Sequence, residues 1–220
     1  MIIALHEFQN NPTMKIFLLP LVFLITISAC KKAKIESVNT NSTTDSLTYQ
    51  PKVPGSVWTY RRTVGGVSNT DFTFTRLTAD TTAYGSTFQI FSSDDNSTSG
   101  VNQYIRQEGN KYYNILTAST NKPQLLILDA AANVGDTWLG GTNGSDTYTF
   151  TMKQKIPVYM LDNFTFKNVL VVHLDRTGPN PLTADTYYAQ GVGQVKSEGT
   201  ISFGGITTSI NLKVLTVNLR

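Results

Sequence analysis

Short runs of alternating apolar and polar residues, separated by turns that contain glycine, most restrict the fold of this chain. In residues 72–77, one side of an extended strand carries two phenylalanines and the other carries threonines. The same pattern returns in 147–152 and in 209–214. A period of two residues indicates a strand with one buried face and one solvated face. Because no segment keeps an apolar stripe at the helical period, the sequence predicts an all-β protein.

The turns predict how the strands connect. Pairs such as Gly65-Gly66 and Gly204-Gly205 lie between alternating runs, and glycine accepts the positive φ angles of tight hairpins. Short turns favour an antiparallel meander, because parallel strands need long crossovers. A sheet of this size curls, splits or closes, so a sandwich, a half-barrel and a barrel all stay open. We expect about eleven strands, near 56–64, 67–78, 86–92, 101–107, 111–117, 123–129, 144–156, 164–175, 183–190, 193–201 and 206–218.

The region 1–30 has the pattern of a bacterial lipoprotein signal peptide. Lys15 precedes the apolar run 16–27, which is too short to span a bilayer as a helix. The run ends in Ile-Ser-Ala-Cys, which resembles a lipobox, and Met14 is the better start codon. We therefore expect fatty acyl chains such as palmitate on Cys30. Two or more acyl chains attach a protein stably to a membrane, whereas one does so only marginally.

The residues after Cys30 predict a tether followed by one domain. Residues 31–49 have little apolar content, which is typical of a flexible linker, and 50–220 have the size of a single domain. Cys30 is the only cysteine, so the body contains no disulfide. By resemblance to lipoprotein sorting in bacteria with two membranes, Lys31 in place of an aspartate favours the outer membrane. Whether the protein faces the periplasm or the cell surface stays open.

An internal repeat is visible in the body. Gly55-Ser56-Val57-Trp58 is echoed by Gly135-Asp136-Thr137-Trp138, and later elements follow in the same order. The matches predict two units, 53–129 and 134–219, related by an approximate two-fold axis. The alternative is that all β-meanders share threonines, aromatic residues and glycine turns.

The sequence offers little for catalysis, and we expect neither enzymatic activity nor a cofactor. His173 is the one histidine outside the signal region, too few for a zinc site, so we expect no metal. Glycoside hydrolysis needs two facing carboxylates; Glu108 and Asp185 are candidates, although no motif supports them, and a hydrolase is the least favoured function. The net charge is +3, and positive and negative residues are interspersed along the chain. The absence of a basic cluster argues against nucleic acid as a partner.

Adjacent tyrosines leave room for ligand binding. Neighbouring strand residues point to opposite faces, so one member of each pair points outward, where it can stack on a sugar ring or line a groove. The candidates are Tyr112, Tyr113, Tyr187 and Tyr188. Trp58 and Trp138, at the start of each unit, are expected to close the ends of the core.

Two segments resemble uncharacterised bacterial cell-envelope lipoproteins. The first is 186–196, which contains Tyr-Tyr-Ala-Gln-Gly-Val-Gly-Gln-Val-Lys, and the second is Gly55-x-x-Trp58-x-Tyr60. The resemblance covers most of 50–220 and implies an envelope location and a fold, with no catalytic residues to carry over. Together with the lipid anchor on Cys30, it predicts a membrane-attached, non-enzymatic binding or structural accessory module, with an envelope protein or a glycan as partner. The alternative is a carrier of a lipid or glycan in an aromatic groove.

Overall fold

The computed structural model describes residues 48–95, 102–116 and 123–220, and the described chain consists of strands and turns without a helix. The predicted signal peptide, Met14, Cys30 and nearly all of the tether lie outside the described residues. The all-β, antiparallel prediction is confirmed. The strands are β1 (Val57–Val64), β2 (Ser68–Ala83), β3 (Ser86–Ser93), β4 (Gln103–Glu108), β5 (Lys111–Ile115), β6 (Gln124–Asp129), β7 (Thr137–Asn143), β8 (Asp146–Leu161), β9 (Phe164–Thr177), β10 (Leu182–Ala189), β11 (Gly193–Phe203) and β12 (Ile206–Asn218).

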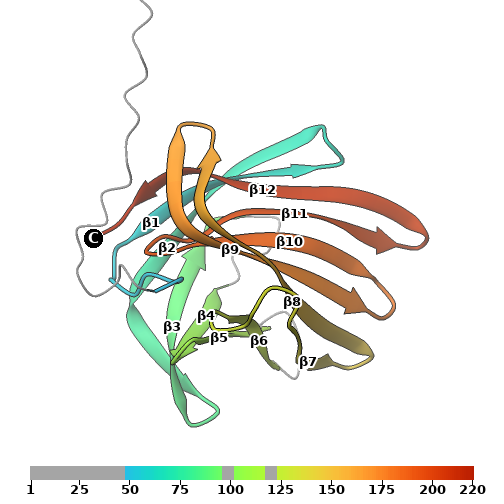
Figure 1. Ribbon diagram of the computed structural model, residues 1–220, viewed down its shortest axis with the longest axis horizontal. Coiled ribbons are helices and arrows are strands. Elements are labelled where there is room, and N and C mark those ends of the chain that lie inside the picture. Colours follow the sequence, from blue (N-terminus) through green and yellow to red (C-terminus); the bar gives the residue numbers. More distant parts are fainter. Residues whose placement is uncertain (1–47, 96–101, 117–122) are drawn as a thin grey trace, which may run out of the picture. The chain divides into compact units, whose positions relative to one another are not determined.

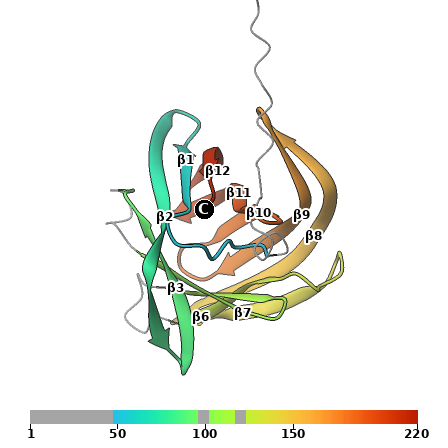
Figure 2. The same cartoon turned by 90° about the vertical axis from the view of Figure 1, so that its left-hand side faces the viewer.

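All twelve strands form one sheet in the order β6-β5-β4-β3-β2-β1-β12-β11-β10-β9-β8-β7. Each strand pairs with its neighbour in sequence, except that β6 does not pair with β7, and β1 also pairs with β12 in an antiparallel ladder. The sheet curls until its two ends, β6 and β7, approach each other, which gives the nearly closed, barrel-like body of Figure 2. Curling buries one face of the sheet without a second layer, as expected for a twisted sheet of many strands.

The ends of the sheet meet without a described ladder of backbone hydrogen bonds. Instead, the indole Nε1 of Trp138 donates a hydrogen bond to the carbonyl oxygen of Leu126, at 3.0 Å. Glycine makes this approach possible: a Cβ on Gly140 would lie 2.2 Å from the ring of Phe150 and 3.0 Å from that same carbonyl oxygen. Residues without a side chain are therefore required where β7 crosses β6.

The structure has twelve strands where the sequence predicted about eleven. The strand that was missed is β7, which contains Gly140-Gly141 and lacks a clear period of two because it serves the closure. Two strands run five residues further than predicted: β2 ends at Ala83 rather than 78, and β8 at Leu161 rather than 156. Pro157 falls within β8, at a point where β8 pairs only with β9 and its other edge needs no amide donor.

A two-stranded arm extends from the sheet. The β8–β9 arm, residues 154–168, crosses in front of β10, β11 and β12 in Figure 1. Its Tyr159 ring stacks on Tyr187 of β10 with centroids 5.1 Å apart, and Lys213 of β12 donates a hydrogen bond to Asp162 at its tip, at 2.8 Å. The arm covers the outer face of the sheet, so residues 169–172 are buried on both faces.

The matched elements of the two predicted units occupy equivalent places. The amide of Gly55 donates to Arg76 and that of Arg76 to Ser56, and the same two bonds join Gly135, Met152 and Asp136. Residues 53–129 contain β1 to β6, and 134–219 contain β7 to β12. The two units are therefore consecutive halves of one sheet; a two-fold axis between them stays a prediction.

Candidate functional site

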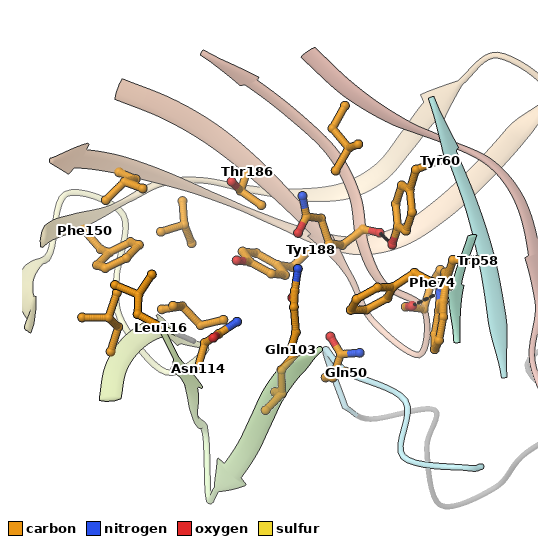
Figure 3. A pocket seen from close by; sticks show the side chains of 18 of the residues that line it. Gln50, Trp58, Tyr60, Phe74, Gln103, Asn114, Leu116, Phe150, Thr186 and Tyr188 are labelled. Atoms are coloured by element: carbon orange, nitrogen blue, oxygen red, sulfur yellow. Dashed lines mark hydrogen bonds between the residues drawn. The ribbon is translucent and has the colours of Figure 1, made fainter. Parts of the chain in front are cut away.

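The body contains a partly open apolar cavity of about 310 Å³. Its walls come from the inner faces of nearly all the strands, where the alternating pattern places aromatic and aliphatic side chains. Figure 3 shows the cavity running from an end formed by Trp58, Tyr60 and Phe74 to an end formed by Phe150 and Leu116. The remaining lining residues are Gln50, Phe72, Gln103, Ile105, Asn114, Leu125, Ile127, Tyr148, Val172, Leu174, Thr186, Tyr188, Val192, Gln194 and Leu212.

The chemistry of the cavity is neutral. Among the described lining residues there is no aspartate, glutamate, lysine, arginine or histidine; the polar groups are amides and hydroxyls. A charged group placed there would lose its hydration without gaining a counter-ion, which is strongly unfavourable. Sites for small molecules are typically apolar cavities of about 300–1,000 Å³ with a few polar groups that orient the ligand. The cavity fits this description at the small end of the range.

Several polar side chains of the cavity have no described hydrogen bond, and the Tyr188 hydroxyl is one of them. Tyr60 and Trp58 are satisfied, because they donate hydrogen bonds to the carbonyl oxygens of Gln194 and Val192 at 2.7 and 2.8 Å. The Tyr188 hydroxyl has no described hydrogen bond and lies between the two ends of the cavity (Figure 3). Burial raises the pKa of Tyr188, so its hydroxyl stays protonated and can donate to a ligand.

The segment before β1 closes one side of the cavity. Gln50, which is 8 % exposed, lines the cavity, and Pro51 is fully buried. The Thr48 carbonyl accepts a hydrogen bond from the Gly191 amide at 2.6 Å, and the Tyr49 amide donates to the Tyr112 hydroxyl at 2.9 Å. Residues 48–51 therefore form a strap between the β4–β5 hairpin and the β10–β11 turn.

The four candidate tyrosines do not share one surface. Tyr112 holds the strap and is 3 % exposed. Tyr113 lies under the guanidinium of Arg106, 4.3 Å from the ring centroid. Tyr187 faces the arm, and Tyr188 alone among the four lines the cavity. A stacking role for each stays a prediction.

His173 belongs to a charged cluster on the outer face. Its Nδ1 lies 2.7 Å from Asp185 Oδ1, and Lys153 forms an ion pair with the other carboxylate oxygen. Burial opposes ionisation of Asp185, but hydrogen bonds from Lys153 and His173 outweigh it and lower the pKa of this carboxyl group. His173 and Asp185 are directly opposite each other on β9 and β10, which brings their side chains within contact distance.

The second carboxylate considered for hydrolysis lies elsewhere. Glu108 pairs with Arg106 at 2.8 Å on β4, which is not a neighbour of β10 in the sheet. Within the described ranges, no group of three or more histidine, cysteine or acidic side chains is placed to hold a metal ion. The same residues contain no helix that is long and apolar enough to cross a membrane.

Sequence reasoning missed most of the cavity. It named Trp58 and the Phe72–Phe74 alternation as core features, and these residues line the cavity wall. Gln50 and the amides of Gln103 and Asn114 were not considered. The available signal was that Trp58 and Tyr60 share one face of their strand, yet no period in a sequence says whether such a face packs solidly or encloses space.

Comparisons with known proteins give weak likenesses. No family model matches the chain, and no curated protein matches it. A solved "putative lipoprotein" from Parabacteroides distasonis is similar at 10% identity and a TM-score of 0.46, over 79% of this chain and 100% of that one. A "putative exported protein with YmcC-like fold" from Bacteroides fragilis has 11% identity and a TM-score of 0.48, over 76% and 97%. A LolA superfamily protein from Nitrosomonas europaea has 10% identity and a TM-score of 0.26, over 80% and 90%.

Proposed function

We propose that this chain is a lipid-anchored protein of the cell envelope that binds an uncharged, single-chain lipid or similar apolar molecule in its interior cavity. The supporting observation is the partly open apolar cavity of about 310 Å³, with the Tyr188 hydroxyl inside it and without a described hydrogen bond. Of the functions that the sequence left open, the cavity favours a carrier or binder of an apolar ligand, a function that needs no catalytic step. A glycan fits poorly, because its many hydroxyls would be buried against aromatic and aliphatic walls.

The proposed ligand has one apolar chain and one neutral polar group. The volume suits a single chain better than a two-chain phospholipid, since sites for small molecules begin at about 300 Å³. The neutral group, an ester or a hydroxyl, accepts a hydrogen bond from Tyr188. A free fatty acid is disfavoured because its carboxylate would meet no cation among the described lining residues.

The proposed anchor is a set of acyl chains on Cys30, at the end of the signal region. It supports a location at the membrane where apolar ligands are found, and Lys31 favours the outer membrane. Mass spectrometry of the protein isolated from membranes tests the anchor directly. An unmodified Cys30 thiol in the mature protein would remove this part of the proposal and leave the cavity untouched.

Tryptophan quenching tests the ligand, because the chain has only two tryptophans and Trp58 lines the cavity whereas Trp138 does not. In the Trp138→Phe variant, Trp58 is the sole reporter. We expect a monoacylglycerol with a brominated chain to quench it saturably, and the corresponding brominated fatty acid to quench it at least tenfold less tightly at neutral pH. Absence of quenching by either compound would refute ligand binding.

A matched pair of variants separates the cavity from the surface. The double change Ile127→Phe and Leu174→Phe adds volume at two half-buried lining positions and should abolish quenching while the fold persists. Leu139→Phe makes the same type of change at a position that is 62% exposed and should bind normally. Equal quenching in both variants would place the bound probe outside the cavity.

A further inference from the structure

The β8–β9 arm presents an unusual outer face. Its inner side packs on the sheet through Tyr159, Leu161 and Phe166, whereas Val158 and Met160 point away and are 58% and 70% exposed. Val158 is paired with exposed Lys167 on the opposite strand. The outward face of the arm therefore combines apolar side chains with a positive charge.

The charge around this face is also one-sided. Lys167 is exposed on this face and is not in a described ion pair. Lys155 is also exposed, but it shares the opposite face of the arm with Tyr159. The one acidic residue of the arm, Asp162, is bound to Lys213 at 2.8 Å. A basic and apolar surface of this kind complements an anionic bilayer: lysines attract the head groups, and apolar side chains enter the interface.

The tether reaches the body at the base of this arm. Tyr49 shares a surface hollow with Lys155, Pro157 and Asn168. The chain between Cys30 and Tyr49 is short enough to keep the body within about 65 Å of the bilayer even when fully extended. A membrane anchor at Cys30 would therefore hold the β8–β9 arm close to the lipid surface.

We propose that the outer face of the β8–β9 arm docks on the anionic lipid surface to which Cys30 is anchored, with Val158 and Met160 in the interface and Lys167 against the head groups. This inference rests on the proposed anchor. The arm is already ordered for the task, because the stacking of Tyr159 on Tyr187 and the Asp162–Lys213 pair hold it against the sheet. Docking would also fix the strap and the cavity wall at Gln50 near the bilayer.

The test uses the full acylated protein in vesicles of phosphatidylcholine with a minority of phosphatidylglycerol. Met160→Cys is labelled with an environment-sensitive fluorophore, since Cys30 is the only other cysteine and its thiol is acylated. Val67→Cys is the control: this apolar residue is 85% exposed in the β1–β2 hairpin, whose strands pair with β12 and β3 rather than with the arm. We expect blue-shifted emission and quenching by brominated lipids at 160 and neither at 67.

Charge reversal supplies the second measurement. Lys167→Glu should lower the ratio of docked to undocked arm by about fivefold or more, since a lysine near an anionic surface contributes about 1 kcal/mol. Protein that floats with the vesicles but shows equal spectra at 160 and 67 would overturn docking while the anchor stands. Protein that does not float would overturn the anchor and the docking that rests on it.

Discussion

Replacing each tryptophan by phenylalanine should show that the hydrogen bonds of the two indole groups contribute unequally to the stability of the fold. The Trp58 indole is 1% exposed and donates to the Val192 carbonyl at 2.8 Å, whereas Trp138 is half-buried and donates to Leu126 at 3.0 Å. Phenylalanine keeps an aromatic ring and loses the donor. A buried acceptor left unpaired costs about 1–3 kcal/mol, and an ordinary hydrogen bond contributes about 0.5–1.5 kcal/mol.

The expected losses follow from burial. Trp58→Phe also leaves a void in a closed core, so the free energy of unfolding should fall by about 3 kcal/mol. Trp138→Phe should lower it by about 1 kcal/mol, because water can reach the seam between β6 and β7 and solvate the Leu126 carbonyl. Urea unfolding followed by circular dichroism measures both values. A loss in Trp138→Phe equal to or above that in Trp58→Phe would refute this reasoning and make the seam the main source of stability.

Three further perturbations follow from single contacts. Gly199→Ala should lower the free energy of unfolding by about 3 kcal/mol or more, and Tm with it, because the new Cβ would lie 2.0 Å from the Thr183 carbonyl oxygen. A Tm like that of the wild type would contradict this. Asp185→Asn should lower the free energy of unfolding at neutral pH, because a carboxyl group with a lowered pKa in the folded state stabilises the fold only while it is ionised. The difference in this free energy between variant and wild type should shrink as the pH falls below about 4. A difference that does not change with pH in urea titrations would count against this. Tyr112→Phe removes the hydroxyl that accepts from the Tyr49 amide, so hydrogen exchange at Tyr49 should accelerate about tenfold, as expected for the loss of about 1.4 kcal/mol; unchanged exchange would show that Gly191 alone holds the strap.

The sequence predicted local structure well because local rules govern it. Alternation placed Phe72 and Phe74 on one inner face, and glycine pairs marked the hairpins at Gly65 and Gly204, where positive φ is needed. The echo between Trp58 and Trp138 matched elements that occupy corresponding strands. The sequence did not predict β7. Its Gly140 and Gly141 allow this strand to lie close to β6, and no local sequence pattern encodes that contact.

Residues 169–172 are a run of apolar residues whose burial is explained only by the tertiary structure. The run's apolar residues on both faces were visible in the sequence, and the structure supplies the reason: Leu170 and Val172 point into the body, and Val169 points toward the arm. The element that covers the outer face is the extension of the same hairpin, which the apolar run alone does not identify.

The amino-acid sequence by itself determined that the body is an antiparallel all-β meander, and it carried the pattern of an acylated terminus. The tertiary structure alone decided that the sheet curls until its ends meet, that the arm folds over its outer face, and that the inner face lines a neutral cavity around Tyr188. The physical reason is that a period of two assigns residues to faces of a strand. How strongly a sheet curls, and which space it leaves empty, depends on contacts between residues far apart in the chain.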